Sequence, residues 1–294
     1  MAVAIDGLIY ASWLFLIAVG LTLIYGVMRI LNMAHGSFYA LGAYAAASLV
    51  GAWLAGGHAP LASYALLVVA AVAVGVVVGP LIERSVLRLT YGRDEIVLVL
   101  VTYALFLVLE DVIKLVWGVD PYFVSEPYGL LGSFEVGELT YPVYNLLLVG
   151  AAVATGAVLG WALRATRQGK ILLAVIHDRE IASALGVDVR RVYLVTFTVG
   201  TMLAALGGAL TAPTVSVVPG MGVEVIVLAF AVVVIGGLGS PLGAALGALI
   251  VGVVRSAAVH YLPQIELFSI YLVMALVLVV RPRGLFGAPE ARRI

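Results

Sequence analysis

Long apolar runs alternate with short polar interruptions along the whole chain. A helix of about 20 apolar residues spans the roughly 30 Å hydrocarbon core of a bilayer, because each residue advances the helix by about 1.5 Å. The pattern therefore predicts an all-α polytopic membrane protein, with about eight or nine transmembrane segments in a single domain, residues 1–294. The predicted segments are residues 7–28, 37–54, 61–82, 95–117, 141–163, 192–212, 223–238, 239–254 and 266–280.

Two polar or short stretches break this regularity. Val223–Leu238 would form only about 24 Å of helix, which is too short for a full crossing. The stretch Asn32–Ser37 interrupts the first apolar region, and polar breaks at membrane depth are tolerated only inside protein or beside a water-filled path. This stretch either lines or supports such a path, or it is a tight turn in which Asn32 and His35 cap helix ends.

Glycine-rich breaks occur at comparable places in the two halves of the chain, and Gly/Ala-rich helices follow both. Short or interrupted segments at corresponding places are typical of transporters built from two related halves, whose path lies between the repeats. The pattern therefore predicts a translocation path at these breaks. The predicted path residues are Asn32, His35, Ser37, Tyr39, Gly236, Gly237, Gly239 and Ser240.

The charges of the connecting segments predict an orientation in the membrane. Thirteen of the 16 Lys and Arg residues lie in residues 83–94, in the loop 164–191 and in the tail after Val280. The loop 118–140 carries only acidic charges. Because cytoplasmic loops are enriched in Lys and Arg, we expect a multi-pass protein of the cell (inner) membrane, with the N-terminus outside and the C-terminus cytoplasmic. Loop 118–140 is then external, and Arg255 and His260 fall in an outer connection.

Composition mainly excludes functions. The chain has 64% hydrophobic and 11% charged residues, and it contains no cysteine. Its four histidines are scattered without metal-ligand spacing, so we predict no metal site and no cofactor. A P-loop is missing because Gly169-Lys170 is followed by Ile171 and lacks the upstream glycine. The chain is therefore expected to be a transport subunit and not an enzyme.

Charges also occur near the outer end of the segment 95–117. Glu110 and Lys114 are four residues apart, in the order that favours an ion pair on one helical face, and Asp111 lies beside them. Charged residues within a span often serve function. Both a structural pair and a role in transport are compatible with this spacing.

The loop 164–191 has a short helix at its centre, according to its composition. Residues 170–185 contain neither proline nor glycine, and Gly186 follows as a suitable helix C-terminus. The polar run His177–Glu180 surrounds this helix with charge over nearly a full turn, which suggests a surface that meets a partner. A solvated connector is the alternative. The pattern E-x-A-x-x-x-G at Glu180, Ala182 and Gly186 resembles the coupling segment of ABC-importer permeases.

The sequence as a whole resembles the Liv-type inner-membrane family, the permeases of branched-chain amino acid ABC importers. The resemblance rests on LTLIYGVMRILNMAHGSFYALGAY, AVIHDREIASALGV, PGMGVEVIVLAFAVVVIGGLGSPLGA and the terminal RPRGLFG. It implies an amino-acid substrate, a second homologous permease, two ABC ATPase subunits, an external solute-binding protein and no nucleic-acid partner. The implied ATPase-coupling residues are His177, Asp178, Arg179, Glu180, Ala182 and Gly186.

Three other functions are alternatives to a branched-chain amino acid permease. The same class includes permeases of urea or aromatic-acid importers. An ion-coupled secondary transporter would normally place an acid deep in a span, and the nearest candidate is Glu224 at a helix start. An intramembrane serine protease is disfavoured because His35 and Ser37 are two residues apart and would not face each other on a helix.

Overall fold

The apolar runs form helices at nearly the expected places. The structure is a computed structural model that describes residues 1–137 and 139–287, so Glu138 and the end of the predicted basic tail, residues 288–294, lie outside the described residues. Eight of its helices are long and apolar enough to cross a membrane, which confirms the all-α polytopic class. They are α1 (Ala2–Met28), α2 (His35–Ala55), α3 (Ser63–Ser85), α4 (Glu95–Trp117), α6 (Val143–Ala165), α9 (Val189–Thr211), α11 (Pro241–Tyr261) and α12 (Glu266–Val280). Helix α12 reaches a spanning length of 18 residues together with the 3-10 turn Pro263–Ile265 that precedes it. A ninth, α10 (Met221–Gly236), has 16 residues and is short, as predicted.

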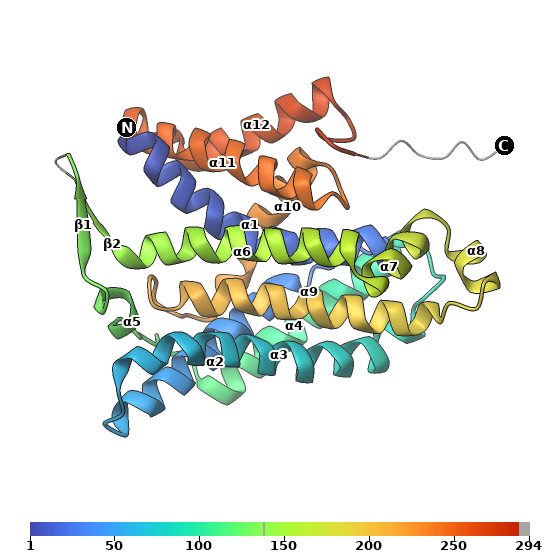
Figure 1. Ribbon diagram of the computed structural model, residues 1–294, viewed down its shortest axis with the longest axis horizontal. Helices are drawn as coiled ribbons and strands as arrows, with labels where there is room; N and C mark the ends of the chain where they lie inside the picture. Colours follow the sequence, from blue (N-terminus) through green and yellow to red (C-terminus); the bar gives the residue numbers. More distant parts are fainter. Residues whose placement is uncertain (138, 288–294) are drawn as a thin grey trace.

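The connecting elements collect at two opposite ends of the bundle (Figure 1). At the end that we call the acidic end lie the N-terminus, α5 (Glu126–Gly129) and a hairpin of β1 (Ser133–Val136) and β2 (Leu139–Pro142). The opposite, basic end carries α7 (Arg167–His177) and α8 (Arg179–Ala184). The apolar pattern did not predict the hairpin, because strands of four residues are too short to show a period. The two ends therefore separate the charges as the sequence predicted.

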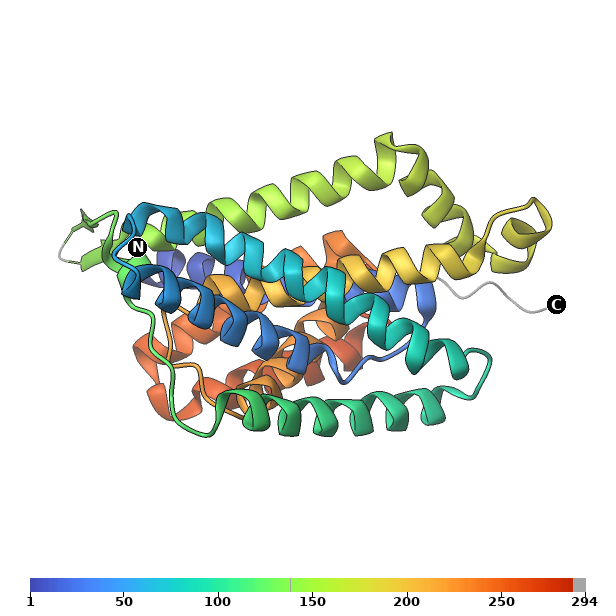
Figure 2. The same cartoon turned by 90° about the horizontal axis from the view of Figure 1, so that it is seen from below.

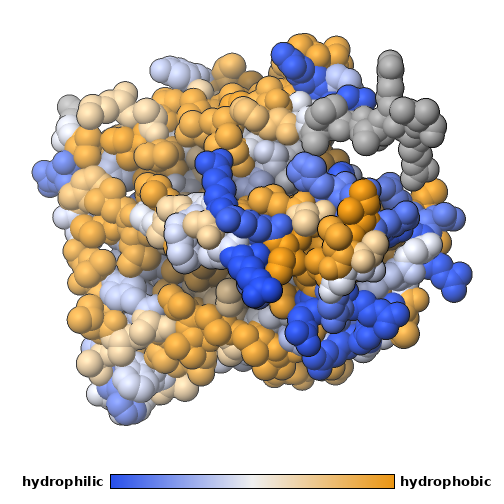
Figure 3. Space-filling model, turned by 45° about the vertical axis from the view of Figure 1, so that its right-hand side comes forward, coloured by the Kyte–Doolittle hydropathy of each residue, from blue (hydrophilic) through white to orange (hydrophobic). Residues whose placement is uncertain are grey.

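Helix α1 lies at the centre of the bundle and packs against α6, α9, α10 and α11. Its side chains from Leu14 to Val19 are almost fully buried. In contrast, α4, α6 and α12 expose most of their apolar side chains, which suits a lipid environment. Figures 1 and 2 show these helices on the outside of the bundle, and Figure 3 shows hydrophilic residues gathered toward the basic end, next to broad apolar flanks.

Small residues bring α2 and α9 into direct backbone contact. A Cβ atom on Gly208 would stand 1.9 Å from the carbonyl oxygen of Tyr39, and one on Gly42 would stand 2.1 Å from that of Ala205. Tight crossings at small residues are the usual way in which helices associate in a membrane, where the hydrophobic effect does not drive association. This crossing fixes the position of α2 within the bundle.

Helix α2 begins deep inside the bundle. Nε2 of His35 lies 2.9 Å from the Ile17 carbonyl oxygen, and the Ser37 hydroxyl donates to the Phe106 carbonyl at 3.3 Å. Ile17 and Phe106 are each about 16 Å of helix from the basic end of α1 or α4. The polar stretch 32–37 is therefore enclosed by protein, and the Asn32 side chain accepts a hydrogen bond from the Ala34 amide at 3.2 Å in the turn before α2. No side chain caps the start of α2, so the interpretation of Asn32 and His35 as helix caps is wrong.

The start of α10 meets the start of α2 at the same depth. The two helices touch through Gly36 and Gly222, where a Cβ on Gly36 would stand 2.3 Å from the Gly222 carbonyl oxygen. The Gly220 amide at the start of α10 donates to Oε2 of Glu110 at 2.9 Å. A carboxylate at this place complements the positive end of the α10 dipole. The non-helical segment 29–34, before α2, is thus matched by Pro213–Gly220, before α10. The glycine-rich stretch after α10 does not meet it.

Two expectations about charged residues are wrong. Lys114 pairs with Asp111 at 3.2 Å, while Glu110 is buried and points to α10 instead of to Lys114. The tertiary contact with Gly220 takes precedence over a weak surface pair on one helix. Arg255 and His260 belong to α11, because this helix continues to Tyr261, seven residues beyond the expected end of its apolar run.

We expect Glu110→Ala to destabilise the protein by about 1–3 kcal/mol, because the Gly220 amide then loses its acceptor in a buried place. Asp111→Asn, one residue further, is the matched control, since its exposed pair with Lys114 contributes little. Thermal unfolding of both variants in the same detergent measures the difference. Equal unfolding temperatures for the two variants would contradict the role of Glu110.

Candidate functional site

An open cavity of about 690 Å³, which we call the outer cavity, lies at the acidic end. It is enclosed by the first half of α1, by α2, α5, α6, α10 and α11, and by the end of α9 with the connection from α9 to α10. Its charged lining residues are Asp6, Glu224 and Arg255, and apolar residues such as Leu148 and Leu228 supply much of the remaining wall. The cavity therefore combines charges of both signs with an apolar surface.

A polar network fixes the rim of the outer cavity. The guanidinium of Arg255 forms an ion pair with Glu266 and lies 3.9 Å from the centre of the Tyr10 ring. Asp6 lies one helical turn before Tyr10, and its Oδ2 is 3.5 Å from Nε2 of His260. These contacts connect α1, α11 and α12, so Arg255 and Asp6 are held in place before any ligand enters.

Tyr39 and Trp13 belong to the inner part of the outer cavity. The Trp13 indole N–H donates to the Tyr39 hydroxyl at 3.3 Å. His35 follows one turn deeper on α2 and is fully buried, and its Nδ1 has no hydrogen-bond partner among the described residues. Of the four predicted path residues at the first break, Tyr39 lines the cavity, while Asn32, His35 and Ser37 are buried below it.

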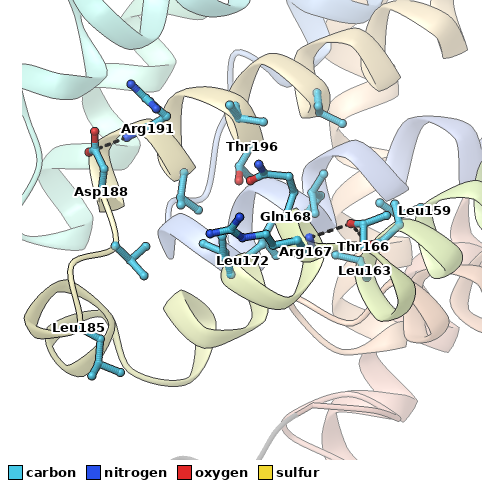
Figure 4. A pocket seen from close by; sticks show the side chains of 18 of the residues that line it. Leu159, Leu163, Thr166, Arg167, Gln168, Leu172, Leu185, Asp188, Arg191 and Thr196 are labelled. Carbon is cyan, nitrogen blue, oxygen red and sulfur yellow. Dashed lines mark hydrogen bonds between the residues drawn. The ribbon is translucent and has the colours of Figure 1, made fainter.

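A second open cavity of about 840 Å³, the inner cavity, lies at the basic end between α6, α7 and α9. Figure 2 shows α6 separating from α9 toward this end, and Figure 4 shows Arg167 and Gln168 between α7 and α9. The segment after α8, from Leu185 to Asp188, forms part of the cavity wall. The inner cavity thus borders directly on the loop 164–191.

Helices α1, α6 and α9 line both cavities, and a packed layer separates the two. The outer cavity uses Trp13 of α1, whereas the inner cavity uses Leu23 of the same helix. Between these levels the Phe15 ring packs against α6, 3.4 Å from the place of a Cβ on Gly156. At Gly20 a Cβ would stand 2.6 Å from the Gly200 carbonyl oxygen of α9. This layer is closed in the structure.

The other predicted path residues lie at the basic end, away from both cavities. Gly236 ends α10, and its carbonyl accepts from the Phe286 amide at 2.9 Å. Gly237 and Gly239 have φ angles of 104° and 83°, which favour glycine, and Gly239 packs on Gly26 of α1. Ser240 caps α11 by accepting from the Gly243 amide at 3.0 Å. The structure does not bring these four residues together with Tyr39.

The loop 164–191 contains two short helices, so the prediction of one helix over residues 170–185 is wrong. Asp178 separates α7 from α8 with φ −155° and ψ 106°. Its Oδ1 accepts from the Glu180 and Ile181 amides at 2.8 and 2.9 Å, which makes Asp178 the N-cap of α8. Asparagine and aspartate favour this position because their side chains replace backbone acceptors.

The predicted coupling residues follow one another along this bend. His177 ends α7, Asp178 caps α8, and Arg179 and Glu180 are exposed on its first turn. Ala182 is buried against the bundle, and Gly186 ends the segment with φ 85°. Two residues that the sequence pattern did not single out, Ile181 and Leu185, lie one turn apart and are 60% and 80% exposed. An exposed apolar face of this kind is typical of an interaction surface.

One known protein family matches nearly the whole chain. The family described as "Branched-chain amino acid transport system / permease component" matches residues 3–280. The chain belongs to this family. The match includes both cavities and the loop 164–191, so the chain is a permease component and a multi-pass membrane protein.

Individual relatives are similar over nearly their full length. The high-affinity branched-chain amino acid transport system permease protein LivH of Escherichia coli K12 is 29% identical, with 98% of this chain and 96% of LivH covered. BraD of Pseudomonas aeruginosa, with the same description, is also 29% identical and covers 99% and 96%. A probable LivH permease of Methanocaldococcus jannaschii is 28% identical and covers 95% and 90%. No solved structure matches the chain.

The polar residues of the outer cavity were missed as a site from the sequence. They come from seven helices and the connection between α9 and α10, and neither their spacing nor their order along the chain brings them together. Glu224 was noted only as an acid at a helix start, and Arg255 only as part of a connection. Within the described residues no group of three or more His, Asp or Glu side chains could hold a metal ion.

Proposed function

We propose that the chain is the membrane-spanning subunit of an ATP-driven ABC importer and moves branched-chain amino acids across the membrane. The observation that carries this proposal is the exposed face at α8. There the apolar residues Ile181 and Leu185, the C-cap of α8, lie beside two charged residues, Arg179 and Glu180. A buried core helix would hide such residues. An apolar centre with charges around it suits docking into a cleft of another protein.

We also propose the partners and the orientation in the membrane. Two ABC ATPase subunits would dock at the basic end, a second homologous permease would lie beside this chain in the membrane, and a solute-binding protein would deliver substrate at the acidic end. The basic loops then face the cytoplasm, with the N-terminus outside and the C-terminus inside. ATP hydrolysis belongs to the partner subunits.

The bend at Asp178 suggests how ATPase movement reaches the path. Residues Leu185–Asp188 leave α8 and form part of the inner cavity wall. A displacement of α8 therefore changes the shape of that cavity without an additional connecting element. In this mechanism α8 docks on the ATPase subunit and can move relative to α7 at the bend formed by Asp178. The sequence had predicted one helix in place of α7 and α8.

The path would pass between the two cavities by alternate opening. In the structure the layer around Phe15 and Gly20 is closed, and Tyr39 stands on its outer side. Asn32, His35 and Ser37 would support this layer from α2, and Gly236–Ser240 would close the basic end around α1. Rearrangement of tightly packed glycine contacts requires only small shifts of the helices.

Reconstitution of the complete complex tests the proposal. With both permeases, the ATPase subunits and the binding protein in liposomes, we expect ATP-dependent uptake of radiolabelled leucine, isoleucine and valine, and no uptake by the permease alone. Urea and benzoate are included because related importers carry urea or aromatic acids. Uptake of urea or benzoate with no uptake of leucine would contradict the assigned substrate, and uptake without ATPase subunits would contradict the mechanism.

A further inference from the structure

The outer cavity has the charges that a zwitterion requires. Asp6 and Glu224 provide carboxylates, Arg255 provides a guanidinium, and all three line one cavity. We propose that this cavity binds the transported amino acid directly, with Arg255 holding the α-carboxylate and Glu224, together with Asp6, receiving the α-ammonium. This inference rests on the proposed function and extends it to named residues inside the permease.

The balance of charge favours a ligand with a positive group. Arg255 is already paired with Glu266, which offsets much of its charge, whereas Glu224 has no ion-pair partner among the described residues. The lining is therefore net acidic. A neutral molecule such as urea gains little from such a site. An aromatic carboxylate can pair only with Arg255, whereas an amino acid also places an ammonium group at the two acids.

Arg255 is arranged to accept a carboxylate. Its guanidinium is fixed between Glu266 and the Tyr10 ring, so little rotamer freedom is lost when a ligand binds. The Arg255 side chain is 28% exposed and lines the cavity, so a ligand carboxylate can reach its guanidinium beside Glu266.

Glu224 is placed between the solvent and the apolar part of the cavity. It is exposed, and it lies on the same face of α10 as Leu228, one turn deeper, which also lines the cavity. Leu148 of α6 and the rings of Trp13 and Tyr39 complete the wall. An ammonium at Glu224 would leave the apolar side chain of the ligand toward this wall, and aromatic faces also attract cations.

The volume agrees with a small-molecule site. At about 690 Å³ the outer cavity falls within the range of about 300–1,000 Å³ that is usual for such sites. It has room for an amino acid together with several waters. The site therefore needs no enlargement to admit leucine, isoleucine or valine from the acidic end.

The absence of cysteine from the sequence allows a direct binding assay. Ser216→Cys places a single thiol on the exposed cavity lining, and Ser133→Cys places one on the hairpin as a control. The reconstituted complex is labelled with a membrane-impermeant maleimide. We expect millimolar L-leucine to slow labelling of Ser216→Cys at least threefold, while urea and benzoate do not, and labelling of Ser133→Cys stays unchanged.

Variants of the acid then test its role. Added to Ser216→Cys, Glu224→Gln should abolish the protection by leucine, and Glu224→Asp should retain part of it. Glu126→Gln is the matched control, because Glu126 is an exposed acid of the same end and does not line the cavity. Labelling without leucine reports whether each variant keeps its folded cavity.

The outcomes separate this inference from the proposed function. Leucine uptake by the complex, together with unprotected labelling at Ser216→Cys, overturns the site and leaves the importer intact. Full protection in the Glu224→Gln variant overturns the assigned role of Glu224. A complex that imports no amino acid overturns the proposed function, and this inference falls with it.

Discussion

Gly208→Ala is expected to destabilise the bundle by several kcal/mol, although it adds only one methyl group. The new Cβ would stand 1.9 Å from the carbonyl oxygen of Tyr39, which is backbone and cannot rotate away. Helices α2 and α9 would have to separate, and overpacking in a rigid core costs about 1–3 kcal/mol or more. Because Tyr39 also lines the outer cavity, leucine uptake should fall together with thermal stability.

Gly150→Ala provides the matched control for this change. Gly150 is also a helical glycine in a membrane-spanning segment, α6, but open space surrounds the position of its Cβ. Alanine has a higher helix propensity than glycine by about 1 kcal/mol, so this variant should be neutral or slightly more stable. Thermal unfolding in detergent compares the two. Equal stabilities would mean that the α2–α9 crossing is not tight in solution.

The nine apolar helices could be predicted from the sequence because the bilayer restricts the backbone conformations of a spanning segment. Apolar segments such as Glu95–Trp117 must satisfy their backbone hydrogen bonds internally, and a helix is the solution available to a single segment. The short length of α10 followed from the same counting. Local composition was sufficient to predict a helix wherever the surroundings of the segment, lipid or protein interior, were apolar along its whole length.

Local rules failed where a side chain had two competing partners. The i,i+4 rule assigned Glu110 to Lys114, yet the carboxylate binds the amide of Gly220, which is 110 residues further along the chain. Helix propensity joined residues 170–185 into one helix, although Asp178 is a strong N-cap residue. The second error was avoidable from sequence. The first was not, because the contact depends on the packing of α4 against the start of α10.

The candidate site was only partly visible for a similar reason. The predicted coupling segment is continuous in sequence, so the spacing of Glu180, Ala182 and Gly186 could suggest it. The outer cavity is assembled from seven helices and a connection, and Arg255 and Asp6 are 249 positions apart. A spatial cluster of this kind leaves no period or motif in the sequence. Only the fold shows that these charges share one cavity.

The exposed face of α8 leads to the prediction with the largest effect on function. We expect Leu185→Asp, and separately Glu180→Lys, to abolish co-purification of the ATPase subunits and ATP-dependent uptake. Leu185 is 80% exposed, and a carboxylate there would have to be desolvated in the docked complex. Substitutions at the centre of an interface commonly cost 2 kcal/mol or more, which corresponds to about a 30-fold loss of affinity.

Val119→Asp separates docking from a general effect of a new surface charge. Val119 is 71% exposed and lies two residues after the end of α4, in the connection to α5. Because α5 and α8 lie at opposite ends of the bundle (Figure 1), its substitution should leave ATPase binding intact. Membrane insertion and unfolding temperature should be the same for all three variants, since the altered side chains are exposed. Normal ATPase binding by both α8 variants would remove this helix as the docking element. Loss of binding without loss of folding would place the contact on α8, and movement of α8 would then reach the inner cavity through residues 185–188.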